Sequence, residues 1–95
     1  MKSSRVLVPW PAGLHLRPAM RLARLAQTFS SRIVLKCGDK LADARSLVSI
    51  LLLAATMGTA LDVEISGDDE ANAARAFANA FAADDDGEGG TPAMK

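Results

Sequence analysis

The spacing of apolar residues predicts four strands along the chain. Residues 32–37 and 60–65 alternate between inward-facing apolar side chains and mostly polar neighbours, which is typical of strands with one buried face. A short apolar run predicts a first strand at 5–8. Gly38-Asp39 predicts a tight hairpin to a strand at 40–43, so at least this pair should be antiparallel.

Two longer segments show the three-to-four-residue spacing of amphipathic helices, one at 16–29 and one beginning near residue 70. The expected inward positions are Leu22, Leu25, Ala26 and Phe29 in the first and Ala71, Ala74, Phe77, Ala78 and Phe81 in the second. Acidic residues precede the second helix, where the positive end of its dipole favours them.

A short helix predicted at 47–53 follows Ser46, a residue type favoured at the N-cap. The segment is apolar nearly all round, although a helix that covers one side of a sheet needs only one apolar face. Part of the set should therefore be exposed and suited to docking, or else the run is simply core. The set is Leu47, Val48, Leu51 and Leu52.

The element order β-α-β-β-α-β-α predicts a two-layer α+β domain, an open-faced sandwich with an antiparallel sheet covered on one side by three helices. The pattern leaves the strand order open. The chain of 95 residues, 49% of them hydrophobic, suits one compact domain at 1–83. Residues 84–95 are acidic and then rich in Gly, without periodicity, so we expect a disordered tail there.

The stretch Gly13-Leu14-His15-Leu16-Arg17-Pro18-Ala19 contains the only histidine of the chain. Pro18 is tolerated in the first turn of a helix, which places His15 at or next to the N-cap. The first-turn N–H groups and the helix dipole favour a phosphate or another anion there, and Arg17 can add a charge-assisted contact. The alternative is an ordinary surface histidine. The combination of Gly, His, Arg and Pro favours the anion site.

Charge is unevenly distributed although the net charge is zero. Residues 1–50 carry nine Lys and Arg against two acids, a net of +7, and residues 51–95 carry −7. Arg17, Arg21 and Arg24 follow one face of the first helix. This arginine strip is either an ordinary solvated helix side or a surface that attracts acidic partners, and the lack of acids within it favours the second reading.

Several other classes of function are disfavoured. One His and one Cys do not make a zinc site, and the single Cys37, without an internal disulfide partner, agrees with a reducing compartment. The longest apolar run, at 47–55, is too short to span a bilayer, so we expect a cytoplasmic protein. The chain has only four aromatic residues, too few to favour nucleic-acid binding by base stacking. Trp10, which lies between two prolines, is either a contact residue or a cover over the core. A histidine-based hydrolase would need further acid–base groups.

The chain resembles the histidine-containing phosphocarrier protein (HPr) family of the bacterial phosphoenolpyruvate-dependent phosphotransferase system. Gly13-Leu14-His15-Leu16-Arg17-Pro18-Ala19 is similar to its active-site signature, and Arg45-Ser46-Leu47 to its regulatory-serine region. Thr56-Met57-Gly58-Thr59 is similar to the turn before its last strand, and the resemblance covers residues 5–83. It implies the strand order 1-4-2-3, with His15 at the sheet edge and reached from outside.

The resemblance also implies a function. His15 would accept a phosphoryl group on Nδ1 from phospho-Enzyme I and pass it to a IIA protein, with Arg17 stabilising the phosphate. The chain would be a monomeric carrier without a cofactor and not an enzyme. HPr kinase/phosphorylase could act on Ser46, and the alternative role is a regulatory adaptor of a nitrogen branch or under phosphoserine control. The expected partner-binding residues are Arg21, Arg24, Leu47, Val48 and Leu51.

Overall fold

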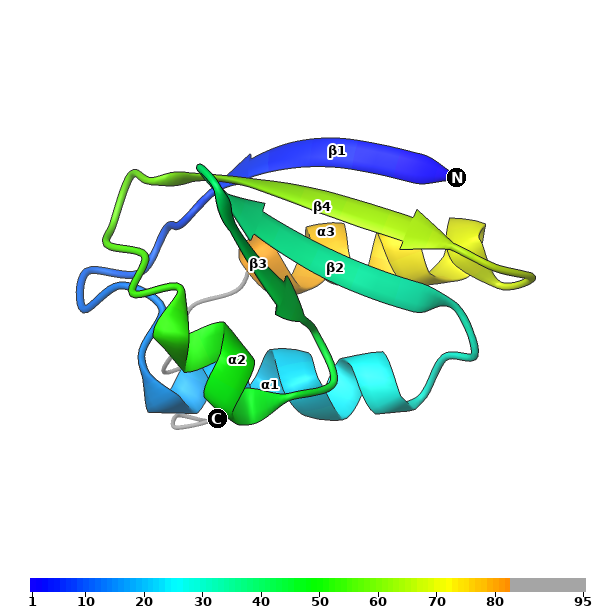
Figure 1. Ribbon diagram of the computed structural model, residues 1–95, viewed down its shortest axis with the longest axis horizontal. Helices are drawn as coiled ribbons and strands as arrows, with labels where there is room; N and C mark the ends of the chain where they lie inside the picture. The colour runs from blue at the N-terminus through cyan, green and yellow to red at the C-terminus, as the bar shows by residue number, and fades with distance from the viewer. Residues whose placement is uncertain (83–95) are drawn as a thin grey trace, which may run out of the picture.

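The computed structural model describes residues 1–82, in which an antiparallel sheet carries helices on one face and is open on the other (Figure 1). The elements are β1 (Lys2–Leu7), α1 (Leu16–Gln27), β2 (Arg32–Cys37), β3 (Lys40–Asp43), α2 (Leu47–Leu52), β4 (Ala60–Ser66) and α3 (Glu70–Ala82). This order and the α+β class are as predicted. The tail predicted at 84–95 lies outside the described residues.

The four strands are arranged in the order β1-β4-β2-β3, so the last strand of the chain lies inside the sheet. Every neighbouring pair is antiparallel, with Arg5 opposite Asp62 and Val34 opposite Glu64. The order implied by the family resemblance is confirmed. On the open face, Arg5 Nε lies 2.9 Å from Asp62 Oδ1 and Lys36 Nζ lies 3.3 Å from Glu64 Oε2, so ion pairs cross between strands there.

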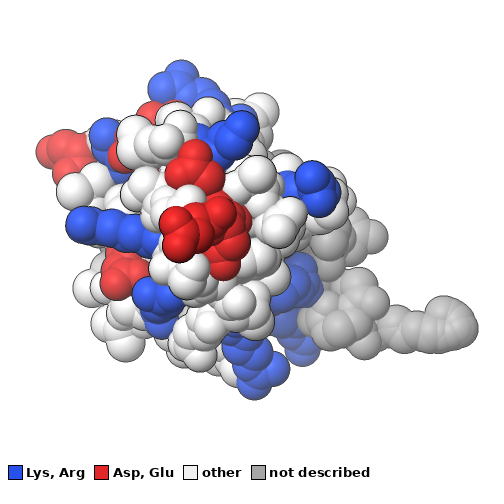
Figure 2. Space-filling model, turned by 90° about the vertical axis from the view of Figure 1, so that its right-hand side faces the viewer, with Lys and Arg blue, Asp and Glu red and all other residues white. Residues whose placement is uncertain are grey.

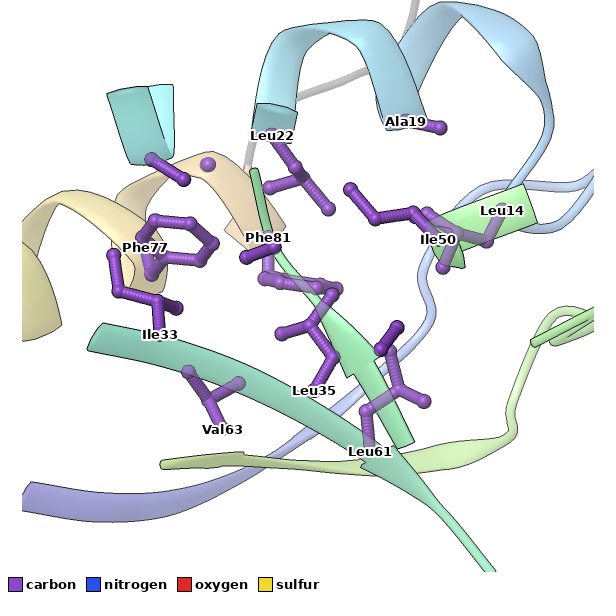
Figure 3. Packing of buried hydrophobic residues seen from close by; sticks show 14 of the residues in the cluster. Leu14, Ala19, Leu22, Ile33, Leu35, Ile50, Leu61, Val63, Phe77 and Phe81 are labelled. Atoms are coloured by element: carbon purple, nitrogen blue, oxygen red, sulfur yellow. The ribbon is translucent and has the colours of Figure 1, made fainter. Parts of the chain in front are cut away.

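The hydrophobic core lies between the sheet and the helices (Figure 3). Leu35, Leu61 and Val63 point from β2 and β4 toward the helices because alternate residues of a strand face opposite sides. Leu22 and Phe77 meet them from α1 and α3. The core therefore fixes the helix positions that carry the candidate site.

β1 differs from its prediction, because it begins at Lys2 and ends at Leu7 instead of covering 5–8. Its first three residues are polar and exposed, so no apolar pattern marks them. They are strand because β1 pairs through its backbone with β4, from Lys2 opposite Ile65 onward. Val8, predicted as the strand end, follows the strand and is buried in the core.

The buried sides of the two long helices also differ from prediction. In α3, Ala73 and Ala80 are buried, whereas Ala71 and Ala78, expected inward, are exposed. Alanine occupies so many positions of α3 that the apolar pattern does not show which side of the helix is buried. In α1, the buried residues are Pro18, Ala19, Leu22, Ala23 and Ala26; Leu25 and Phe29 are half-buried at the margin of the core, and the helix ends at Gln27.

Asp69 joins the start of α3 to the loop between α1 and β2. Its carboxylate accepts hydrogen bonds from the backbone N–H groups of Ser30, at 2.8 Å, and Ser31, at 2.9 Å, and from the Ser31 hydroxyl. Gly67 packs directly on Ser31, with φ +149° and only 2.7 Å between an added Cβ and Ser31 Cα. The β4–α3 loop and the α1–β2 loop are thus held together.

Acidic side chains gather at this end of the molecule, which faces the viewer in Figure 2. Asp68, Asp69 and Glu70 occupy the turn between β4 and α3, at the right of Figure 1. The start of α1, with His15, lies at the opposite end, at the left. The acids of this turn are therefore remote from the candidate site.

We predict that Asp69→Asn lowers the melting temperature by several degrees and reduces the loss of stability in acid. Hydrogen bonds from the Ser31 hydroxyl and from the Ser30 and Ser31 backbone hold the pKa of Asp69 below its usual value. A carboxylate with a lowered folded-state pKa stabilises the fold above the unfolded-state pKa, about 3.9 for Asp, and this stabilisation is lost as pH falls through the folded-state pKa.

Urea unfolding over a series of pH values measures this effect as the slope of the unfolding free energy below about pH 4. The slope should be smaller in Asp69→Asn but not zero, because Arg5 lowers the pKa of Asp62 and the Gly67 N–H lowers that of Glu70. Asp68→Asn, at the exposed neighbouring position, is the matched control. Equal slopes in the wild type and Asp69→Asn would contradict the prediction.

Candidate functional site

His15 is the N-cap of α1, as predicted. Its backbone is extended, with φ −93° and ψ −168°, and its carbonyl accepts the Ala19 N–H at 3.0 Å. Its imidazole makes no capping hydrogen bond to the helix and is half-exposed. Pro18, buried in the first turn, contributes no N–H. The imidazole therefore lies where first-turn N–H groups and the helix dipole favour an anion.

The loop before His15 is fixed by close backbone contacts. The Gly13 N–H donates to the Trp10 carbonyl at 2.8 Å, and the Leu14 N–H donates to the Ala55 carbonyl at 2.8 Å. Gly13 has φ +77°, and a Cβ there would lie 2.7 Å from the Ala55 oxygen. A larger residue would push the loop away from Ala55, so glycine is required both by its conformation and by this contact.

Ala54 directs the Ala55 carbonyl toward this loop. It directly follows the C-cap of α2, Leu53, and has φ +53°, the left-handed conformation that commonly ends helices. Alanine in this conformation costs about 1 kcal/mol because its Cβ crowds the following carbonyl. The sequence reasoning missed Ala54 and Ala55, because such an end is normally marked by glycine.

Trp10 is buried, with 2% of its surface exposed, and its ring centroid lies 5.3 Å from that of Phe81. Of the two interpretations left open by the sequence, this places it in the core and not on a contact surface. The ring contact joins the loop before His15 to the last turn of α3. The end of α3 thus packs against the loop that leads to His15.

The arginine strip begins at the site and continues along α1. Arg17 and Arg24 are exposed, whereas Arg21 is half-buried, so the strip is not solvated along its whole length. At a rise of about 1.5 Å per residue, Arg17 lies in the turn next to His15 and Arg24 lies about 10 Å further along. Of the three, the structure brings only Arg17 into the first turn with His15.

The outer face of α2 carries an exposed apolar patch formed by Val48 and Leu52, which are 65% and 70% exposed and four residues apart. Leu47 and Leu51 are half-buried and pack against the core. The expectation that part of this segment is exposed is confirmed. The candidate docking residues Leu47 and Leu51 are mainly packing residues, because α2 uses that side to cover the sheet.

Ser46 caps α2 with its side chain, which accepts the Ser49 N–H at 3.2 Å. Arg45, just before it, is tied to the end of α1: its guanidinium donates to the Phe29 carbonyl, and its own carbonyl accepts from Gln27 Nε2 at 3.4 Å. The predicted N-cap is confirmed. The role of Arg45 as a brace between α1 and α2 has no signal in the sequence pattern.

Within residues 1–82, no three or more His, Cys, Asp or Glu side chains lie together in a way that could hold a metal ion. No helix among these residues is long and apolar enough to cross a membrane.

Comparison with known proteins identifies the class. The sequence model of the family described as PTS HPr component phosphorylation site matches residues 2–83. Phosphocarrier protein HPr of Haemophilus influenzae is 44% identical over 61 residues, which cover 64% of this chain and 72% of that protein. Phosphocarrier protein NPr of Proteus mirabilis is 37% identical over 78 residues, covering 81% and 87%.

Solved structures agree with these sequence matches. HPr from Thermoanaerobacter tengcongensis superposes with a TM-score of 0.81 at 30% identity, over 87% of this chain and 98% of that one. Fold and sequence together define a phosphocarrier domain of the phosphotransferase system. The chain belongs to the HPr family.

Two longer relatives also match. They are a multiphosphoryl transfer protein of Xanthomonas campestris, 44% identical over 62 residues, and the phosphoryl donor subunit DhaM of a dihydroxyacetone kinase from Providencia stuartii, 42% identical over 67 residues. The chain spans only 7% and 14% of their lengths. The same domain therefore occurs within larger proteins.

We predict that Ala54→Gly stabilises the protein by about 0.5 kcal/mol, because relief of the left-handed strain exceeds the entropy that glycine adds to the unfolded chain. Urea unfolding measures the difference. Ala55→Gly is the matched control and should be destabilising, because Ala55 is buried and has no positive φ. A loss of stability in Ala54→Gly would show that this residue is not strained.

Proposed function

We propose that the chain relays phosphoryl groups through His15, from phospho-Enzyme I to a IIA protein. The observation that carries the proposal is the position of the imidazole at the N-terminus of α1, with Arg17 in the same turn and no capping bond to hold the ring to its own helix. These features belong to a domain of the HPr family.

The chemistry needs little more than positioning and charge stabilisation. The neutral His15 imidazole attacks the phosphorus of the donor phosphohistidine; the new N–P bond forms as the donor N–P bond breaks, and the donor imidazole leaves. When the group passes on, the acceptor histidine attacks the phosphorus, and the His15 imidazole leaves as its N–P bond breaks. The first-turn N–H groups and Arg17 stabilise charge on the transferred phosphoryl oxygens. The chain is then a stoichiometric carrier that depends on partner enzymes for turnover.

Two surfaces on the helices of the described domain suit the partners. Arg21 and Arg24 extend the positive charge of Arg17 along α1 and would speed encounters with acidic surfaces. Val48 offers an exposed apolar contact on α2, and Leu47 and Leu51 support it from beneath. Positive and apolar surfaces together favour a partner with an acidic rim around an apolar centre.

A regulatory role is the second candidate, and two observations favour it. One relative is an NPr and not an HPr. Ser46 caps α2 through its hydroxyl beside the exposed Val48. A phosphate at this serine would be tolerated by the fold because the helix dipole favours it, and would place negative charge at the docking patch. An HPr kinase/phosphorylase is the enzyme class that would add it.

We predict that His15→Ala abolishes uptake of acid-labile phosphate from phosphoenolpyruvate and Enzyme I. The imidazole is the sole histidine side chain, and it makes no capping hydrogen bond, so the melting temperature should change by no more than a few degrees. Radioactive phosphate incorporation measures the uptake. Phosphate that the alanine variant still acquires would refute the relay through His15.

Arg17→Lys should slow phosphoryl acceptance roughly tenfold, the loss expected for one charge-assisted hydrogen bond of the guanidinium fork. The melting temperature should be unchanged because Arg17 is exposed. Rapid-quench kinetics with excess phospho-Enzyme I gives the rate. Arg24→Lys, two turns away on the same helix, is the control and should accept phosphate at the wild-type rate. Equal rates for all three proteins would remove Arg17 from the transfer step.

Ser46→Asp should slow acceptance from Enzyme I several-fold and leave the melting temperature nearly unchanged, because aspartate is also a good N-cap but adds a negative charge beside Val48. Ser46→Asn keeps the cap without the charge and serves as the control. Phosphorylation assays quenched at a series of times measure the rate of acceptance, and thermal unfolding measures the melting temperature. Should Asp and Asn behave alike, Ser46 would be a cap and have no regulatory role.

A further inference from the structure

We infer that the acidic segment Asp84-Asp85-Asp86-Gly87-Glu88 of this chain binds the arginine strip of α1, next to His15. The acidic segment therefore binds within its own molecule. It competes with acidic partners for the arginine strip. The inference about binding stands on the geometry below. Its consequence for phosphoryl transfer rests on the proposed relay.

The geometry brings the segment to the correct end of α1. Ser30 and Ser31, just beyond the end of α1, bind Asp69 at the start of α3, whereas Trp10, just before α1, contacts Phe81 in the last turn of α3. The two helices are therefore antiparallel neighbours, as Figure 1 shows. The chain leaves α3 at Ala82, next to the Phe81 ring that contacts Trp10 and toward the side of the molecule where α1 begins.

The strip lies within reach of the segment. A chain spans at most about 3.5 Å per residue, so the four residues from Ala82 to Asp86 extend up to about 14 Å. The strip from Arg17 to Arg24 is about 10 Å long. Residues 84–88 can therefore lie alongside the strip without any movement of α1 or α3.

Position around α1 favours the same conclusion. Gln27 faces the start of α2, since its side chain bonds to the Arg45 carbonyl. Arg21 lies about 120° around the helix from Gln27, on the side away from α2, and α1 packs against α3 as well as α2. Arg21 thus lies on the side from which the segment approaches, with Arg17 and Arg24 beside it.

Charge makes the match specific. The strip contains three arginines, of which Arg17 and Arg24 are exposed and Arg21 is half-buried, and α1 contains no acidic residue. The segment carries four carboxylates in five positions. Tethering gives the segment an effective concentration in the millimolar range at the strip, so weak individual ion pairs are enough for substantial occupancy.

Occupancy of the strip would lower its attraction for acidic partners. Partner association would then require displacement of residues 84–88, and the segment would set the encounter rate without touching the transferred group. Removing its charge should make association faster at low salt and more sensitive to salt, because the strip then faces the partner alone.

A spin label at position 87 tests the binding in the full chain, independently of phosphoryl transfer. Gly87→Cys in a Cys37→Ser background provides the attachment point. At about 10 mM salt, where the Debye length is about 30 Å, the label should broaden the amide signals of residues 17–24. Raising salt to about 1 M, where that length is about 3 Å, should restore much of their intensity.

Two variants with the same change in net charge distinguish binding of the segment to the strip from broadening that arises only because the label is tethered near α1. Asp85→Asn with Asp86→Asn should reduce the broadening along α1, whereas Asp39→Asn with Asp68→Asn removes two negative charges elsewhere and should not. Equal broadening in both variants, or broadening centred away from α1, would overturn the inference. Broadening that passes from a labelled chain to an isotope-enriched unlabelled one would identify a second copy as the occupant and would also overturn it.

The consequence is measured as the rate of phosphate acceptance from phospho-Enzyme I. Asp85→Asn with Asp86→Asn should accept about three- to fivefold faster than the wild type at low salt, the charge-matched control should not, and the gap should close at about 1 M salt. If Asp85→Asn with Asp86→Asn accepts phosphate no faster than the wild type, the segment does not compete with partners for the strip. Absence of any acceptance by the wild type would refute the relay, while the spin-label result would still decide the binding.

Discussion

The hydrogen bond from the Leu14 N–H to the Ala55 carbonyl is the contact on which the geometry of the candidate site depends. It joins the loop before α1 to the segment that follows α2, and it is possible because Gly13 lacks a Cβ that would otherwise meet the Ala55 oxygen. Leu14 is then buried in the core, and the next residue, His15, is fixed as the N-cap. The position of residue 15 at the start of α1 is thus set by backbone contacts and core packing.

The two ends of the sandwich use charge differently. At the end opposite the site, Asp69 is engaged in hydrogen bonds to the α1–β2 loop, and Glu70 accepts the Gly67 N–H at 3.1 Å. These carboxylates stabilise turns and are held by specific donors. At the site end, the charges on α1 are arginines, and Trp10 and Phe81 provide the structural contact instead. The charged side chains of α1 are therefore all positive, whereas those of the turn before α3 are negative.

Sequence reasoning succeeded where a local rule determines the structure. Residues 32–37 became β2 with the predicted bounds, because period-two alternation directly reports a half-buried strand. His15 was placed at the N-cap because Pro18 restricts where a helix can begin. It failed where the determining contact is distant or the pattern is uniform. Trp10 meets Phe81 from the far end of the chain, and the many alanines of α3 leave its buried side undefined.

The two N-caps observed for α1 and α2 differ in their side-chain hydrogen bonds. Ser46 satisfies the Ser49 N–H with its own side chain, the arrangement that stabilises a helix by about 1 kcal/mol relative to a residue that cannot cap. His15 occupies the same position in α1 and makes no such bond, so the longer helix forgoes that stabilisation. α1 tolerates the loss because Leu22 and Ala26 are fully buried along its inner side. The third residue of α1 is Pro18, which has no N–H for an N-cap side chain to accept, so a serine at position 15 could not repeat the bond that Ser46 makes to Ser49.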